Sequence, residues 1–236
     1  MIKHYLKVAF RNLMKYKTQS LVSIIGLAVG FTCFALSVLW IRYEMTYDTF
    51  HKGAERIYMV RAHYTDIPEH ISNSTPYPLA AYLQEKMPEI EAKATTSIHQ
   101  NVKIRMENDE YEVVMAAADS AFMNFFHIQL LKGTVNFLKE NNPEIAVTEE
   151  FAKKLFGSED DALGKEMEVN GRSRQIGAIV SGWSRHSNIP YSVLVAARHS
   201  PRWKSGPEQL FIRVRAGMDM DTFWKKISTM DLSDIQ

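Results

Sequence analysis

A single long apolar segment separates a short basic head from a mixed polar and apolar body. From Leu21 to Ile41 the sequence has no charged side chain. A helix rises ~1.5 Å per residue, so a segment of about 21 residues spans roughly 30 Å, the thickness of the hydrocarbon core of a bilayer. Trp40 and Tyr43 lie at its far end, where amphipathic rings favour the membrane interface. The pattern predicts a transmembrane helix over residues 20–43.

Two glycines in this segment predict a contact between helices. Gly26 and Gly30 form a G-x-x-x-G pair, a spacing that lets a second membrane helix approach closely. The alternative is the ordinary glycine content of a membrane helix. A cleaved signal peptide competes for the whole segment, but its apolar region is usually roughly 7–15 residues long and ends in small residues. The exit through Trp40, Ile41 and Arg42 favours a retained span.

The head, residues 1–19, has the pattern of an amphipathic helix. Apolar residues recur at helical spacing on one side, and four basic residues recur every four positions on another: Lys3, Lys7, Arg11 and Lys15. Such a helix is expected to lie in the membrane interface on anionic lipid, with a plain positive flank as the alternative. The positive-inside rule places this head in the cytoplasm and the body on the other side of the membrane.

The body, residues 44–236, is predicted to be a mixed α and β domain. Alternating or β-branched runs predict strands at 56–64, 91–99, 101–117, 144–148, 166–180, 191–197 and 209–215. Helical spacing predicts helices at 79–87, 119–128, 149–156 and 219–230. The fold class is therefore α+β, with an N-terminal membrane helix ahead of an extracytoplasmic domain built from βαβ units.

Local signals fix several ends of these elements. Thr148 is expected to cap one helix and Gly157 to end it, while Asp119 or Ser120 is expected to cap another. Asn170-Gly171 between alternating runs is the strongest hairpin signal in the chain, and Asn108-Asp109 predicts a second hairpin.

Composition and charge narrow the function classes. The chain is 46% hydrophobic and 23% charged, as in a folded protein. After Arg42 come 22 of the 28 basic residues and all 27 acidic ones, a net charge of −5, which argues against a nucleic-acid partner. We find no glycine-rich phosphate loop and no metal-binding spacing of histidines. We therefore expect no catalytic residue, no cofactor, no bound metal and no enzyme activity.

The succession of motifs in the body resembles the periplasmic core domain of MacB-type, FtsX-like ABC transporter permeases. The chain's start is similar to the family's basic helix and first span, and a Phe-rich segment is similar to the family's segment that ends in Leu-x-Gly. The matching stretches are Tyr5 to Gly30, Ala118 to Thr134, Thr148-Glu149, Ala152 to Gly157, Gly164-Lys165 and Gln175 to Val180. The chain departs from the family pattern at 181–188, so no ligand contact is assigned there.

The resemblance implies an architecture and a set of partners. The domain is expected to have a core and a smaller β-rich insertion near residues 100–170. The partners implied are a cytoplasmic ABC ATPase subunit, a second permease subunit, membrane lipid and a periplasmic adaptor. The implied setting is a bacterial inner membrane, where ATP-driven motion exports drugs, peptides or lipoproteins. Family members have three further spans, so the sequence is expected to be a truncated product or a fragment.

Two other functions stay open at this point. The chain is alternatively a stand-alone, membrane-anchored binding or chaperone module outside the membrane. A membrane-tethered hydrolase is a third hypothesis, because Gly182 to His186 approaches a nucleophile elbow but lacks its second glycine.

Overall fold

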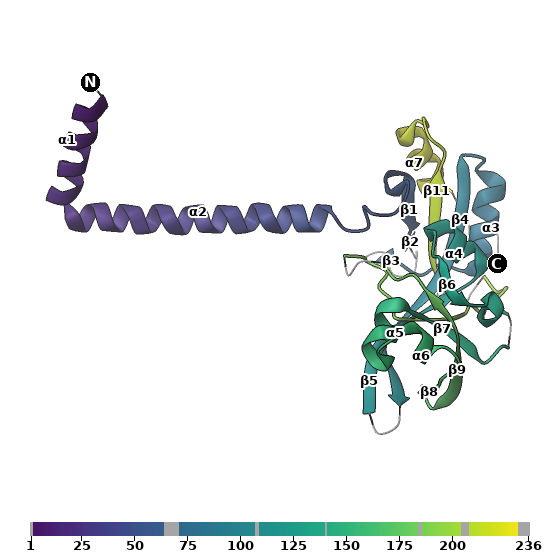
Figure 1. Cartoon of the computed structure of the whole chain (residues 1–236). Helices are drawn as coiled ribbons and strands as arrows, with labels where there is room; N and C mark the ends of the chain where they lie inside the picture. The colour runs from purple at the N-terminus through teal and green to yellow at the C-terminus, as the bar shows by residue number, and fades with distance from the viewer. Residues whose placement is uncertain are drawn as a thin grey trace. The chain divides into compact units, whose positions relative to one another are not determined.

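The chain forms two compact units that divide between Tyr47 and Asp48 (Figure 1). The computed structural model describes residues 2–63, 71–106, 109–139, 141–183, 186–203 and 208–230.

The first unit consists of two helices, α1 (Ile2–Lys15) and α2 (Lys17–Met45). Within the described residues, α2 alone is long and apolar enough to cross a membrane, and none of its residues is buried by the protein. In this helix the hydroxyl groups of Thr32 and Ser37 donate to the backbone carbonyls of Ala28 and Cys33, each at 2.8 Å. These bonds give both hydroxyl groups a partner inside the helix, as lipid surroundings require.

The second unit is built on one mixed sheet. Its strand order is β1-β11-β4-β5-β10-β7-β9-β6, and β8 pairs with both β4 and β9. The β10–β5 and β7–β9 pairs are parallel, and the other pairs are antiparallel. The strands in chain order are β1 (Ile57–Val60), β4 (Ile90–Met106), β5 (Asp109–Ala118), β6 (Leu130–Gly133), β7 (Glu144–Thr148), β8 (Glu166–Val169), β9 (Arg172–Val180), β10 (Val193–Ala196) and β11 (Gln209–Val214).

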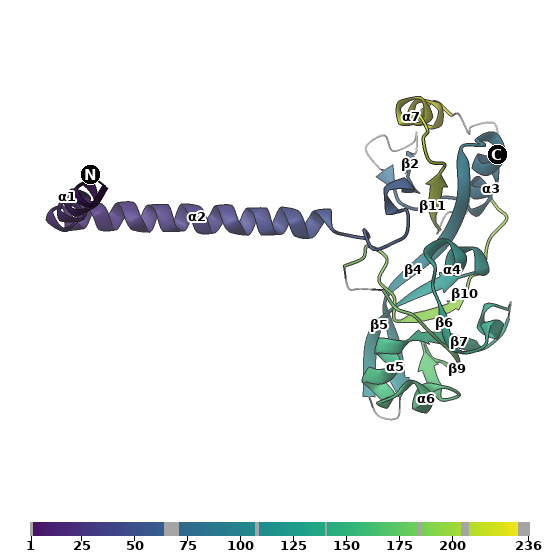
Figure 2. The same cartoon turned by 45° about the horizontal axis from the view of Figure 1, so that its top comes forward.

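Helices and a small ribbon complete the unit. The short strands β2 (Ala62–His63) and β3 (Ile71–Ser72) pair with each other. The α-helices are α3 (Tyr77–Lys86), α4 (Ser120–Phe126), α5 (Glu149–Phe156), α6 (Glu159–Ala162) and α7 (Met220–Ser228), and the single-turn helices are η1 (Ala54–Arg56) and η2 (Val135–Leu138). In both views α3 and α7 lie at one end of the sheet and α5 and α6 at the other (Figures 1 and 2).

The long strand β4 belongs to both ends of the sheet. Its first part, Ile90 to Thr96, pairs with β11, and its second part, Ser97 to Met106, pairs with β5. The two parts were expected to be separate strands, but the chain passes through a bulge at Asn101, whose φ of 54° is left-handed. Asparagine tolerates this conformation, so the strand bends there without ending.

Three clusters of buried apolar side chains lie between the helices and the sheet. One lies among α3, α7 and β11 and contains Leu83, Leu210 and Phe223. A central cluster contains the phenylalanines of α4. The third packs α5 against β7 and the β8–β9 hairpin. Each amphipathic helix therefore covers its own part of the sheet.

The α+β class is confirmed, and so are several local predictions. The hydroxyl of Thr148 accepts from the backbone N–H of Phe151 and caps α5, and Gly157 ends that helix at φ 84°. Asn170 and Gly171, at φ 48° and 76°, make the β8–β9 turn, because a tight hairpin needs left-handed residues at both positions. The β4–β5 hairpin is present, and its turn residue Asn108 lies outside the described residues. Strand β6 was not predicted.

Candidate functional site

The residues predicted from sequence to act in the membrane lie on the two N-terminal helices. Gly26 and Gly30 are one turn apart on α2, and a Cβ atom added at either would meet no other atom within 4 Å. The predicted basic stripe lies along α1, where the side chains of Lys7, Arg11 and Lys15 are exposed and Lys3 is within the helix. Helix packing at the glycines and lipid contact by the stripe stay predictions.

In the second unit, a polar junction forms at its first residue, Asp48. The carboxylate of Asp48 accepts hydrogen bonds from the hydroxyl of Ser187 and from the backbone and side-chain amides of Asn188, the last two at 3.1 and 2.9 Å. Its own backbone N–H donates to the carbonyl of His186 at 3.1 Å. We call these four residues the Asp48 junction. It ties the chain's entry into the domain to the loop that follows β9.

The junction rests on an aromatic cluster. The ring of His51 lies 4.9 Å from the rings of both Trp183 and Phe126, measured between centroids. The indole N–H of Trp183 donates to the carbonyl of Ile189 at 2.7 Å, and the hydroxyl of Tyr191 donates to Ser181 at 2.8 Å. These bonds hold the loop after β9 in place at both of its ends.

His51 is a buried histidine that faces the junction. Burial lowers its pKa, the carboxylate of Asp48 acts in the opposite direction, and His127 lowers the pKa further. Its Nε2 lies 3.9 Å from a carboxylate oxygen of Asp48 and has no hydrogen-bond partner among the described residues. A neutral ring is therefore favoured, with only a weak tie to Asp48.

A cleft of about 400 Å³ opens beside the junction, and we call it the junction cleft. Its walls come from the junction itself and from the neighbouring strands β1 and β11. The lining includes Asp48, His51, Asn188, Ile57, Met59 and Phe211.

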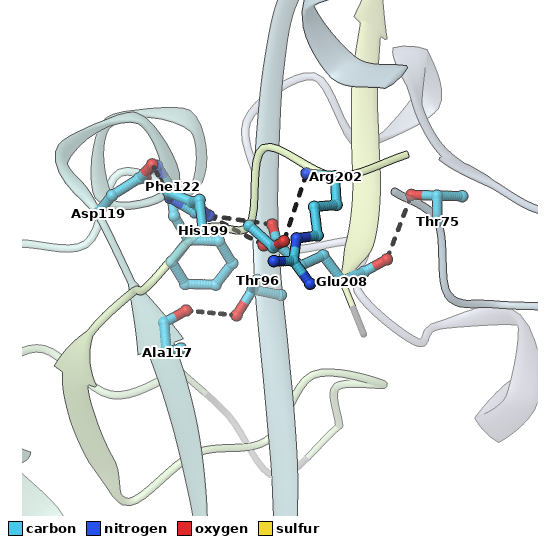
Figure 3. A network of polar contacts seen from close by, with 9 residues as sticks. Thr75, Thr96, Ala117, Asp119, Phe122, His199, Arg202 and Glu208 are labelled. Carbon is cyan, nitrogen blue, oxygen red and sulfur yellow. Dashed lines mark hydrogen bonds and ion pairs between the residues drawn. The ribbon is translucent and has the colours of Figure 1, made fainter. Parts of the chain in front are cut away.

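A second polar cluster lies in the middle of the domain, around His199 (Figure 3). The Nδ1 atom of His199 lies 3.1 Å from each carboxylate oxygen of Glu208, and its Nε2 lies 3.2 Å from Asp119. The ring of Tyr77 stacks on the imidazole, with centroids 3.9 Å apart and planes at 10°. We call these four residues the His199 cluster.

The two carboxylates stabilise the charged form of the histidine. Hydrogen bonds to Asp119 and Glu208 raise the pKa of His199 to about 9. Burial opposes ionisation of Asp119, but its hydrogen bonds to His199 and to Phe122 lower its pKa overall. Burial, followed by the two carboxylates, raises the pKa of Tyr77, so its hydroxyl stays neutral.

The His199 cluster joins three elements. Asp119 caps α4 through the backbone N–H of Phe122 at 2.7 Å, and Tyr77 is the first residue of α3. The backbone carbonyl of Glu208, next to β11, accepts from the backbone N–H of Thr75 at 2.7 Å. Both ring nitrogens are engaged, so the imidazolium acts as a cross-link and offers no free base.

The Asp48 junction likewise acts as a cross-link, because the carboxylate of Asp48 already accepts hydrogen bonds from three donors. Among the described residues, no group of three His, Cys, Asp or Glu side chains could hold a metal ion. Ser184, the serine of the proposed elbow, lies outside the described residues, and the carbonyl of His186 is bound to Asp48. What both clusters do is hold separate segments together.

Sequence reasoning missed both clusters. Asp48 and Ser187 are 139 positions apart, and His199 and Asp119 are 80 apart. Neither spacing belongs to a motif. The one available signal was the succession of short polar residues at 186–188, which was treated as a divergent stretch with no contact assigned.

Comparisons with known proteins give a consistent result. A family model described as the MacB-like periplasmic core domain matches residues 20–230. No curated protein matches the sequence. A domain of a candidate permease protein from Porphyromonas gingivalis superposes with a TM-score of 0.61 at 21% identity, covering 78% of this chain and 88% of that one.

Two further solved structures share the fold. The extracellular domain of the noncanonic ABC-type transporter YknZ from Gram-positive bacteria has a TM-score of 0.50 at 11% identity, covering 70% of this chain and 86% of its own. The periplasmic region of MacB from Actinobacillus actinomycetemcomitans has a TM-score of 0.50 at 13% identity, covering 72% and 78%.

Proposed function

Because the chain belongs to the MacB-like periplasmic core domain family, which supports a role as a transporter permease, we propose that it is the N-terminal part of an ABC export permease. In this role α2 anchors the chain in the membrane and the domain works outside the cytoplasm. ATP-driven movement of the membrane part reaches the domain through α2. The cargo is a drug, a peptide or a lipoprotein.

The extent of the family match carries this proposal. The match begins at residue 20, in α2, and continues to residue 230, beyond α7. The apolar helix and the folded domain are therefore parts of one family unit. A generic anchor on an unrelated domain would not be included in such a match.

The Asp48 junction supplies the route for transmission. Asp48 directly follows Tyr47, the last residue of the first unit. A displacement of the chain at this point is passed to the loop at 186–188 through the hydrogen bonds of the junction. That loop continues into β10, which lies inside the sheet. The bonds make the entry point stiff, as a mechanical relay requires.

The partners follow from the family and from the basic head. An ABC ATPase binds on the cytoplasmic side, the side where the positive-inside rule places α1. A second permease subunit packs against α2, and a periplasmic adaptor contacts the outer domain. The basic stripe of α1, formed by Lys3, Lys7, Arg11 and Lys15, contacts anionic lipid. The subdivision of the domain, with an insertion near 100–170, stays a prediction.

Thiol labelling in cells tests orientation and coupling together. The only cysteine, Cys33, is replaced by serine, and a new cysteine is placed at the exposed Phe50, beside the junction. A membrane-impermeant maleimide should label Phe50→Cys from outside intact cells. In isolated membranes, ATP with vanadate should change the labelling rate at this site. The matched control is Glu112→Cys on β5, which should label equally in both states. Labelling that is absent in intact cells, or insensitive to nucleotide, contradicts the proposal.

Cross-linking through Cys33 tests the second subunit. Cys33 is exposed on α2, seven residues from Gly26, so it lies on the same side of the helix. Oxidation in membranes should give a disulfide-linked dimer. Replacing both Gly26 and Gly30 by leucine should weaken the cross-link, whereas Ala28→Leu, on the opposite side, should not. Equal cross-linking in all variants would remove the glycines from the interface.

A further inference from the structure

A second cleft, of about 510 Å³, lies where two strands of the sheet separate. The antiparallel pairing of β10 with β7 consists of Val193 with Val147 and Leu194 with Ala146. Val195 and Ala196 continue β10 along β5 but line the cleft on their other side. The floor of the cleft is therefore apolar sheet surface with an open strand edge.

Arginines dominate the rim of this cleft. Arg172 and Arg174 come from β9, and Arg198 follows β10. No carboxylate of the described residues lies within 4.0 Å of any of the three guanidinium groups. By contrast, Lys103 and Arg105 on β4 both pair with Glu110, at 2.8 and 3.4 Å. In a domain with an acidic net charge, three arginines that have no acidic partner among the described residues are held around one cavity.

The polar contacts within the rim leave this positive charge in place. Arg198 donates to the side-chain oxygen of Asn141 at 3.3 Å, a neutral partner. Among the described residues, Glu144 is the one acidic residue in the lining, and its carboxylate accepts from the amide of Asn142 at 3.3 Å and packs against Gly177. Three arginines against one glutamate give the cleft an excess of two positive charges.

We propose that this cleft binds a small molecule that carries two or more oxyanion groups, either phosphate or carboxylate. Guanidinium groups bind both kinds of group through paired N–H bonds, and arginine is preferred wherever such planar recognition is needed. The volume is within the range of sites for small ligands, and its apolar floor accommodates the carbon skeleton between the charged groups. The site is separate from the Asp48 junction and does not depend on the permease role.

Calorimetric titration of the full chain in a neutral detergent tests the proposal. The probes are pyrophosphate, for phosphate groups, and citrate, for carboxylates. We expect saturable binding of at least one probe. Arg172→Gln, Arg174→Gln and Arg198→Gln should each weaken it about tenfold or more, because a hydrogen bond to a charged group contributes ~1.5–3 kcal/mol. Arg174→Lys, which keeps the charge but loses the paired geometry, should weaken it less than Arg174→Gln.

The control is Arg215→Gln, an exposed arginine outside the cleft, which should bind like the wild type. Circular dichroism checks that each variant is folded. Binding of pyrophosphate alone assigns the cleft to phosphates, and binding of citrate alone assigns it to carboxylates. Absence of saturable binding for both probes overturns the proposal, as does binding that survives all three glutamine substitutions.

Discussion

Replacing His199 by glutamine should remove a pH-dependent part of the domain's stability. The pKa of His199 rises from 6.5 to about 9 on folding, so the folded state binds the proton more tightly than the unfolded chain does. Its contribution is fully present below pH 6.5 and is lost as the pH rises through about 9. Glutamine keeps a polar side chain of similar size but cannot carry the charge.

The magnitude can be worked from the geometry. A shift of this size corresponds to roughly 3 kcal/mol at 1.36 kcal/mol per pKa unit. One fifth of the His199 side chain is exposed, and 30% of the Asp119 side chain, so solvent screens part of the attraction. We therefore expect about 1–2 kcal/mol, which is about 2–8 °C in Tm for a domain of this size.

Thermal unfolding of the full chain in detergent, followed by tryptophan fluorescence between pH 7 and 10, is the assay. Wild-type Tm should fall across this range, and the fall should be smaller by the amount above in His199→Gln. His51 does not interfere, because its lowered pKa places its titration below this window. His99→Gln, a histidine with no carboxylate partner among the described residues, is the control. A pH slope that is the same in His199→Gln and the wild type refutes the reasoning.

Three other changes have clear expected outcomes, each measured by urea unfolding. Asp48→Ala should cost about 1–3 kcal/mol because the donors of Ser187 and Asn188 lose their acceptor. Asp48→Asn should cost less because asparagine tolerates the left-handed φ of 55° at this position; equal losses in the two variants would exclude a contribution from the backbone conformation. Gly133→Ala should cost about 3 kcal/mol or more, because φ is 81° and its Cβ would lie 2.2 Å from a carbonyl oxygen of Gly177. Gly157→Ala, with open space, should cost about 1–2 kcal/mol, and a similar loss at both glycines would contradict the steric argument. Thr148→Ala should cost about 1 kcal/mol through loss of the α5 cap, while Thr148→Ser should be nearly neutral; an equal loss in both would assign the effect to packing.

The features that sequence predicted well are those decided within a few residues. The Thr148 cap and the Asn170-Gly171 turn each depend on side-chain and backbone chemistry inside one turn of chain. The apolar run of α2 is likewise a local property. These predictions needed no knowledge of what packs against the segment.

Features decided by distant partners were missed. At Asn101 the local sequence indicated an interruption, but pairing with β5 on both sides of the bulge keeps β4 continuous. Strand β6 has no β-branched residue, and it is a strand because β9 offers it a free edge. The partners of Asp48 and His199 are brought near by the sheet, and no spacing in the sequence records them.

The position of β11 sets the order in which the domain can be completed during synthesis. This strand, Gln209–Val214, lies between β1 and the first part of β4 and is the last strand among the residues that the structure describes. During synthesis, β1 and that part of β4 keep unpaired edges until β11 has been made. Open edges are sites of aggregation. We therefore expect this half of the domain to fold only after β11 is complete, and expect chaperones to be needed most in that interval.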